Sequence, residues 1–192
     1  MIVLIINGAP RAGKDTFIEL VAEVIGEPVA VYSSIDWVKE QAKIMGWDGV
    51  KDTKGRAFCS EIKDACTKYN DRPFTEIMKM YEKAIIPPYN RMPYFCTNIR
   101  EPAEITKLED HCAERSISCY SIWIRNHTAE KNAETLTNSG DTQYMNHSYS
   151  FQVPNHTTLD DFKNGVEILL SIITQREVNV HNNSGSNQIE KE

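Results

Sequence analysis

The chain opens on five consecutive apolar residues, Ile2 to Ile6, and a glycine-rich segment follows almost at once. A run that is apolar at every position fits a strand covered on both faces, as in parallel sheets with helices on either side. The glycine-rich segment leads into a helix-like stretch, Phe17–Ile25, which Gly26 and Pro28 close. The sequence therefore begins with a buried strand, a glycine-rich turn and a helix.

Strand-like and helix-like segments alternate along the rest of the chain. Further strands are expected at Val29–Ser33, Met92–Thr97, Ser118–Ile124 and Tyr149–Val153. Helices are expected at Asp36–Met45, Lys54–Tyr69, Phe74–Ile85, Pro102–Glu114 and Leu159–Gln175. This alternation predicts an α/β chain with a three-layer α/β/α fold around a five-stranded parallel sheet, joined by right-handed crossovers. We interpret residues 1–176 as a single domain and residues 177–192 as a flexible polar tail.

Composition and charge exclude several classes of protein. With 41% hydrophobic and 25% charged residues, the 192-residue chain is globular rather than disordered. Its apolar runs are far shorter than the roughly 20 residues that cross a bilayer, and no signal peptide is indicated. A net charge of −6 argues against a protein that coats nucleic acid. We therefore expect a cytoplasmic monomer or homodimer that binds small molecules and neither nucleic acid nor membrane.

Residues 8–16 carry the sharpest chemical signal, because they fit the phosphate-binding pattern G-x-x-x-x-G-K. The segment consists of Gly8, Ala9, Pro10, Arg11, Ala12, Gly13, Lys14, Asp15 and Thr16. Glycines let the backbone turn its N–H groups inward to form an anion nest, and the following helix adds its positive N-terminal end. Lys14 is expected to contact the β- and γ-phosphates of a nucleotide, with Arg11 as a second cation.

The residue after the loop lysine is Asp15, where most such loops carry a serine or threonine that ligates magnesium. Two interpretations of Asp15 stay open. Its carboxylate contacts Mg²⁺, directly or through water and assisted by Thr16, or it turns away to pair with Arg11. Asn98, a neutral oxygen donor at the end of a predicted strand, is the third metal candidate.

The G-K-D-T form of the loop resembles that of phage-type deoxynucleoside monophosphate kinases and animal-type phosphomevalonate kinases, within the wider P-loop kinases. Thr97–Arg100, followed by Glu101–Glu104, is similar to their T-D-V-R…N-E segment, with Asn98 in place of the aspartate. Trp123–Arg125 resembles the strand that precedes their lid. The resemblance implies ATP and Mg²⁺ as cofactors, Arg100 and Arg125 as catalytic residues, and residues 126–147 as a polar, irregular, lid-like insertion.

The resemblance also places acceptor-binding helices in residues 46–91. Arg56, Arg72 and Arg91 lie in this region and are candidates for binding an acceptor phosphate through their bidentate forks. An isolated arginine is also common in surface ion pairs, and that alternative stays open for each of the three.

These features favour an ATP-dependent phosphotransferase whose acceptor is a small phosphorylated molecule, a nucleoside or deoxynucleoside monophosphate. Such transfer needs positioning and cations more than covalent chemistry from the protein. The alternative is a nucleotide-binding regulatory protein, or an ATPase without a small acceptor. Asn98 keeps this alternative open, whereas the lack of an N-K-x-D segment argues against a GTPase.

Overall fold

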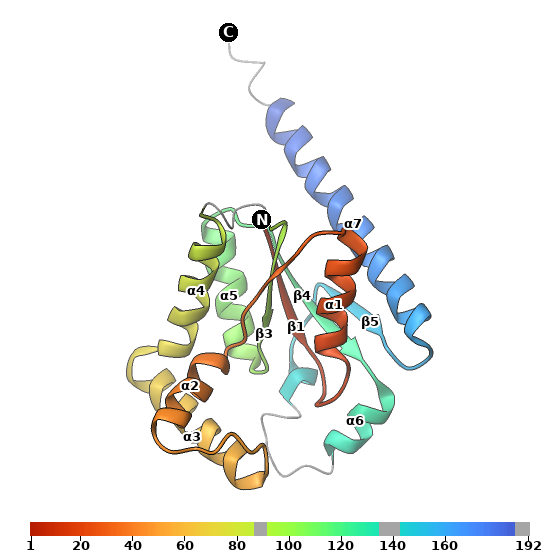
Figure 1. Cartoon of the computed structure of the whole chain (residues 1–192). Helices are drawn as coiled ribbons and strands as arrows, with labels where there is room; N and C mark the ends of the chain where they lie inside the picture. Colours follow the sequence, from red (N-terminus) through yellow and green to blue (C-terminus); the bar gives the residue numbers. More distant parts are fainter. Residues whose placement is uncertain (87–91, 135–142, 187–192) are drawn as a thin grey trace.

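The structure is a computed structural model that describes residues 1–86, 92–134 and 143–186 (Figure 1). Its five strands form one parallel sheet in the order β2-β3-β1-β4-β5. The strands are β1 (Ile2–Asn7), β2 (Ala30–Val31), β3 (Tyr94–Asn98), β4 (Cys119–Arg125) and β5 (Phe151–Pro154). The predicted five-stranded parallel sheet is therefore confirmed, although β2 is shorter than the sequence indicated.

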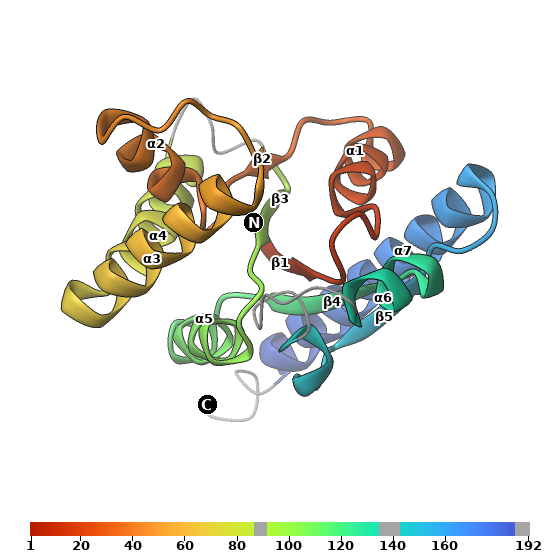
Figure 2. The same ribbon diagram turned by 90° about the horizontal axis from the view of Figure 1, so that it is seen from below.

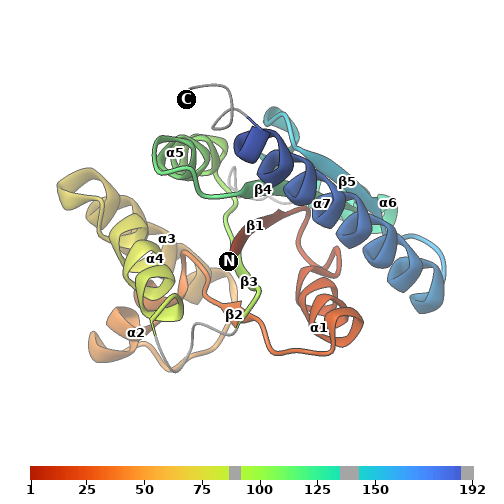
Figure 3. The same ribbon diagram turned by 90° about the horizontal axis from the view of Figure 1, so that it is seen from above.

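Helices cover both faces of this sheet, which confirms the three-layer arrangement (Figure 3). The helices are α1 (Lys14–Ile25), α2 (Asp36–Ile44), α3 (Thr53–Asn70), α4 (Arg72–Ala84), α5 (Pro102–Glu114), α6 (His127–Glu134) and α7 (Leu159–Ser186). Helices α1 and α7 pack on one face, and α4 and α5 pack on the other. None of the described helices is both long enough and apolar enough to cross a membrane.

The opening apolar run is explained by the central position of β1. Leu4 and Ile6 point into the core shared with α1 and α7, while Val3 and Ile5 point into the core shared with α4 and α5. All four side chains are at most 2% exposed. Because full burial of such a side chain contributes about 1.5–3 kcal/mol, the strand stabilises both layers.

The last helix is longer than the sequence indicated. It was expected to end at Gln175 but continues to Ser186, so residues 177–186 are helical rather than frayed. Tertiary contacts hold the first turn of this extension. Ser118, which precedes β4, and Tyr120 of β4 donate hydrogen bonds to the Glu177 carboxylate, and Arg176 lies 4.8 Å from the ring centre of Phe151. The flexible tail was predicted from polar composition, and these long-range contacts stabilise a helix there despite that composition.

Part of the segment expected to be irregular, residues 126–147, is also regular. Residues 127–134 form α6, and Gln143–Asn146 form a short 3₁₀ helix. The Asn126 side chain accepts a hydrogen bond from the Ala129 amide at the start of α6. Ala129 and Ala133 are buried in the core, which holds the helix against the sheet. Residues 135–142 of the predicted lid-like insertion lie outside the described part of the chain.

Elements on both sides of β1 frame the carboxyl edge of the sheet. Figure 2 views the molecule from this edge, with α2 and α3 on one side and α1, α6 and the start of α7 on the other. Helices α2 and α3 form a small core of their own around Val38, Ala42 and Cys59. The Asp52 carboxylate caps α3 by accepting from the Gly55 amide at 2.7 Å. The segment after β1 therefore lies between two helical units.

Candidate active site

The predicted phosphate-binding loop connects β1 to α1 and has the backbone that the motif requires. Gly8 and Gly13 have φ angles of +145° and +99°, in the region that glycine alone enters readily. Arg11 also has a positive φ, +66°, which is uncommon for a residue with a side chain. The 12-residue α1 begins at Lys14, directly after Gly13. The loop thus presents the positive end of a helix to the carboxyl edge of the sheet.

Neighbouring elements hold the loop at close range. A Cβ on Gly8 would lie 2.6 Å from the Ile124 carbonyl oxygen, and a Cβ on Gly13 would lie 2.3 Å from Asn155 Nδ2. The Asn155 side chain donates to the Ala12 carbonyl at 2.8 Å, and the Asn155 backbone amide donates to the Arg125 carbonyl at 2.7 Å. The end of β4 and the turn after β5 therefore fix the shape of the loop.

The Lys14 side chain folds back over the loop. Its ammonium donates to the carbonyl oxygens of Gly8 and Ala9, both at 2.9 Å. The loop backbone itself thus places the cation at the mouth of the anion nest. The role of Lys14 as a phosphate contact stays a prediction.

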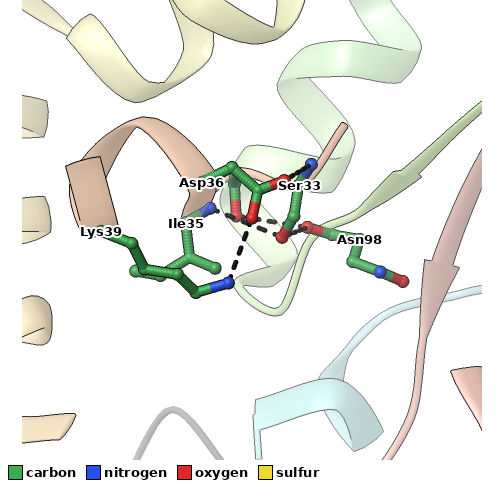
Figure 4. A network of polar contacts seen from close by, with 6 residues as sticks. Ser33, Ile35, Asp36, Lys39 and Asn98 are labelled. Atoms are coloured by element: carbon green, nitrogen blue, oxygen red, sulfur yellow. Dashed lines mark hydrogen bonds and ion pairs between the residues drawn. The ribbon is translucent and has the colours of Figure 1, made fainter. Parts of the chain in front are cut away.

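Asn98 ends β3 with its main chain and side chain in different environments. Its carbonyl oxygen accepts from the amide and hydroxyl of Ser34, at 3.3 and 3.2 Å, while its side-chain amide points away from Ser33 and Asp36 (Figure 4). Both oxygens of Asp36 are engaged, by the Ser33 amide and by Lys39. The Asn98 Oδ1 atom is buried and has no hydrogen-bond partner within the described part of the chain.

The three predicted metal ligands fit Mg²⁺ in the chemistry of their donors. An unpartnered buried oxygen on Asn98, a hydroxyl on Thr16 and an exposed carboxylate on Asp15 are the hard donors that this ion prefers. No group of three or more histidine, cysteine, aspartate or glutamate side chains that could hold a metal occurs in the described ranges. An ion here would accordingly keep water and phosphate oxygens in its shell, as Mg²⁺ commonly does.

Arg100 follows β3 directly and has an exposed side chain. Its main-chain carbonyl accepts from the buried side chain of Asn7, the last residue of β1, at 3.1 Å. Because β1 and β3 are paired in parallel, this bond fixes the backbone of Arg100 beside the phosphate loop. The backbone of Arg100 therefore lies close to the first residue of the phosphate loop.

Arg125 closes β4 on the opposite side of β1 and is held by several contacts. Its guanidinium pairs with the Glu130 carboxylate of α6 at 2.8 Å and lies 4.2 Å from the ring centre of Trp123. A longer bond of 3.3 Å reaches Gln152 of β5. These contacts position Arg125 beside α6, and two hydrogen bonds through Asn155 connect its main chain to the loop.

Two of the predicted acceptor arginines, Arg56 and Arg72, lie far apart. Arg56 lies in the first turn of α3 and Arg72 just beyond its end, and a helix of 18 residues is about 27 Å long. The Arg56 side chain donates to the Lys51 carbonyl, whereas Arg72 pairs with Glu76 at 2.8 Å. Arg91 lies outside the described residues. Arg56 and Arg72 therefore remain two separate candidates rather than one clamp.

A buried ion pair that the sequence did not indicate links α3 to the start of α5. Lys63 is 7% exposed and donates to the carboxylate of Glu101, the residue after Arg100. Burial by itself raises the pKa of Glu101, but the Lys63 ammonium outweighs it and holds that pKa below its usual range. For Glu104, burial prevails and raises the pKa. Sequence pattern offers no signal for this pair, since Lys63 sits in a helix rich in polar residues.

We expect Glu101→Gln to lower the free energy of unfolding by about 3 kcal/mol, because it leaves the buried Lys63 charge without its partner. Since the folded-state pKa of Glu101 is lowered, its stabilisation is complete above the ordinary carboxyl pKa of about 4.3 and disappears as the pH falls through the lowered value. Urea unfolding of both proteins near neutrality and in acid measures this, and the difference should shrink in acid.

The matched control is Glu23→Gln, which breaks the exposed pair between Glu23 and Lys163. An exposed pair contributes less than about 1 kcal/mol, so this variant should unfold almost as the wild type does. Equal losses in the two variants would contradict a special role for the buried pair.

A cavity of about 530 Å³ lies elsewhere, against α4 and α5. Its lining residues are Phe74, Ala103, Thr106, Lys107, Asp110, His111 and Glu114. None of them belongs to the phosphate loop, and Lys107 is already paired with Asp71. We therefore do not assign this cavity to the nucleotide.

Comparison with solved structures places this geometry in a known architecture. The APS kinase CysC of Mycobacterium tuberculosis, in complex with AMPPNP and APS, has a TM-score of 0.52 at 12% identity, with 88% of this chain and 97% of that chain covered. A gluconokinase from Sinorhizobium meliloti 1021 gives 0.51 at 12%, covering 95% and 97%. Shikimate kinase from Aquifex aeolicus gives 0.51 at 14%, covering 91% and 98%.

This chain accordingly shares the α/β/α fold of these three kinases. No family model matches the chain, and no curated protein shows significant similarity to it in sequence.

Proposed function

We propose that this protein transfers the γ-phosphoryl group of ATP to a small phosphorylated acceptor, a nucleoside or deoxynucleoside monophosphate. The observation that carries the proposal is the loop between β1 and α1. It combines left-handed glycines, an exposed helix N-terminus and a lysine ammonium held at its mouth. Proteins of the same fold include kinases of APS, gluconate and shikimate by name, which supports phosphoryl transfer as the reaction.

The ends of the central strands support a phosphorylated acceptor over a hydroxyl acceptor. A hydroxyl group must lose its proton during transfer and benefits from a nearby carboxylate base. A monophosphate is already ionised at neutral pH and needs cations instead. In this protein β1 and β3 end in the neutral amides of Asn7 and Asn98, and both oxygens of Asp36 are engaged. The resemblance of the G-K-D-T loop to deoxynucleoside monophosphate kinases agrees with this choice.

In the proposed reaction the protein acts by positioning and by positive charge. The loop amides and Lys14 bind the β- and γ-phosphates, while Arg100 and Arg125 neutralise charge from the ends of β3 and β4. The helices within residues 46–91 hold the acceptor, with Arg56 and Arg72 as separate candidate contacts. A Mg²⁺ ion held by Asp15, Thr16 and Asn98 would supply a further positive charge beside the phosphates.

The test is ADP release from ATP in the presence of single acceptors. The panel comprises the nucleoside and deoxynucleoside monophosphates, phosphomevalonate, and the hydroxyl acids gluconate and shikimate. Release that a monophosphate stimulates supports the proposal, and product phosphorylation is confirmed by ³¹P NMR. Stimulation by a hydroxyl acid alone would refute the acceptor class while preserving the reaction type.

The same assay separates the alternative of a regulatory nucleotide-binding protein or an acceptor-independent ATPase. The observation that favours this alternative is Asn98, which lacks the charge expected at this position. ATP hydrolysis that no acceptor changes, or nucleotide binding without turnover, would support it.

We expect Asp15→Asn to raise the magnesium concentration needed for half-maximal turnover by roughly tenfold, the lower end of the loss seen when a supporting metal contact is removed. Metal-free ATP binding should not weaken, because the substitution removes a negative charge near the phosphates. Magnesium titration of turnover measures the first effect, and calorimetric titration with ATP measures the second.

Glu19→Gln is the control, since Glu19 is also an exposed acid on α1 but lies one turn further along. It should leave the magnesium titration unchanged. Identical titrations for wild type and Asp15→Asn would assign Asp15 to the other interpretation, a partner of Arg11.

A further inference from the structure

A chain of hydrogen bonds runs from the first amide of the phosphate loop to the residues just before β5. The Gly8 amide donates to Asn7 Oδ1 at 2.8 Å, and Asn7 Nδ2 donates to the Tyr149 hydroxyl at 2.8 Å. The Tyr149 hydroxyl donates to the Tyr144 carbonyl, also at 2.8 Å. The same Asn7 Nδ2 donates to the Arg100 carbonyl at 3.1 Å. One amide side chain therefore joins the loop, the end of β3 and the segment before β5.

Each hydrogen bond in this series can form with only one choice of donor and acceptor. The Tyr144 carbonyl only accepts, so the Tyr149 hydroxyl must give its proton to it and accept from Asn7. That requirement turns Asn7 Nδ2 toward Tyr149 and Oδ1 toward the Gly8 amide. Tyr149 thus fixes which way the Asn7 amide faces, together with the Arg100 carbonyl and the Gly8 amide.

The surroundings make this orientation rigid. Asn7 is 1% exposed, so water does not replace a lost partner. The Tyr149 ring packs against Trp123 and His147, with ring centres 5.7 and 4.9 Å away. Burial, the largest cause, raises the pKa of the Tyr149 hydroxyl far above its usual range, so the phenol keeps the proton that it donates.

We propose that Asn7 and Tyr149 are positioning residues for phosphoryl transfer. Asn7 binds both the Gly8 amide and the Arg100 carbonyl. The pair thereby fixes the first residue of the phosphate loop and the backbone of Arg100 relative to each other. The loop and the guanidinium then act on the same transferred group. This inference rests on the proposed function, and it adds two residues that touch neither nucleotide nor acceptor.

Tyr149→Phe tests the proposal because it keeps the ring and removes the hydroxyl. Without the hydroxyl, the Asn7 amide loses one of its three partners and is held by the Gly8 amide and the longer bond to the Arg100 carbonyl alone. We expect kcat to fall by 10- to 100-fold, on the order of the loss caused by a small misplacement of reacting groups. The KM for ATP should change less than about twofold, because the loop amides and Lys14 still bind the phosphates.

Tyr120→Phe is the matched control. It also removes one partly buried hydrogen bond of a phenol, the bond from Tyr120 to Glu177. Tyr120 lies near the start of β4, at the end remote from the loop. Each variant should lose about 1 kcal/mol of stability, so their thermal midpoints should be alike. If kcat fell equally in both variants, the loss in Tyr149→Phe would result from general destabilisation. That outcome would overturn the proposal.

Hydrogen exchange at the Gly8 amide provides a readout that does not depend on activity. In Tyr149→Phe this exchange should accelerate by about tenfold, corresponding to about 1.4 kcal/mol of lost protection, whereas Tyr120→Phe should leave it unchanged. Unchanged exchange in Tyr149→Phe overturns the inference whatever the activity shows. Accelerated exchange with an unchanged kcat overturns the positioning role.

The proposed function and this inference fail in different ways. If the wild type phosphorylates no acceptor in the panel, the proposed function fails, and a role of the pair in transfer fails with it. Exchange at Gly8 then still shows whether Tyr149 orients the loop. If the wild type is active and only the control variant behaves as expected, the inference alone is wrong.

Discussion

We expect Lys14→Ala to fold as the wild type does and to lose phosphoryl transfer by on the order of 1,000-fold. Cations that stabilise the charge of a transferred phosphoryl group contribute effects of this size. The Lys14 ammonium donates to the loop carbonyls of Gly8 and Ala9, and the side chain belongs to neither hydrophobic core that packs on the sheet, so its removal should leave the fold in place. Turnover, ATP affinity and the thermal midpoint of the variant measure the effect.

Lys163→Ala serves as the control for this experiment. Lys163 is a lysine of α7 that pairs with Glu23 on the protein surface, away from the loop. Its removal should leave turnover unchanged. A folded Lys14→Ala variant with near-wild-type turnover would contradict the assignment of the phosphate loop.

Gly8→Ala should be the most damaging small substitution in the loop. The added Cβ would meet the Ile124 carbonyl at 2.6 Å, and main-chain oxygen of a buried strand cannot move aside as a side-chain tip can. The φ of +145° adds backbone strain of about 1–3 kcal/mol. We expect ATP binding to be lost and the protein to be destabilised by at least this strain, as calorimetric ATP titration and urea unfolding will measure.

Gly46→Ala separates strain from steric conflict. Gly46 has a φ of +98° but nothing within 4 Å of an added Cβ. It should therefore show the backbone strain alone and keep ATP affinity. If the two alanine variants bound ATP equally well, close packing against β4 would not be what shapes the loop.

Local sequence pattern predicted the parts of the fold that local physics determines. The apolar run of β1 indicated burial on both faces, and the Pro102 start of α5 fell where the structure has it. The end of α7 could not be predicted in this way. The first turn of its extension depends on contacts of Glu177 with Ser118 and Tyr120, residues far away in the sequence.

The same distinction holds within the candidate site. The glycines and lysine of the Gly8–Thr16 motif stand at a recognisable spacing in the sequence, so the residues of the loop could be named in advance, although β4 and the turn after β5 help to fix its shape. Asn7, Asn155 and Lys63 act through partners that only the tertiary fold brings near. Asn7 is a polar residue at the end of an apolar strand, but the local pattern does not distinguish Asn155 or Lys63 from their polar neighbours, and it identifies no partner for any of the three.

The central place of β1 also determines when the loop can form during folding. β1 pairs with β3 and β4, and residue Ile2 meets Tyr94 while Val3 meets Cys119. The strand that carries the loop is thus synthesised long before either neighbour exists, and Asn155, which holds Ala12, comes later still. Pairings of such long range form slowly, because their loop-closure entropy is lost before contacts offset it. A segment that is made before both of its partner strands is therefore among the last to acquire its binding geometry.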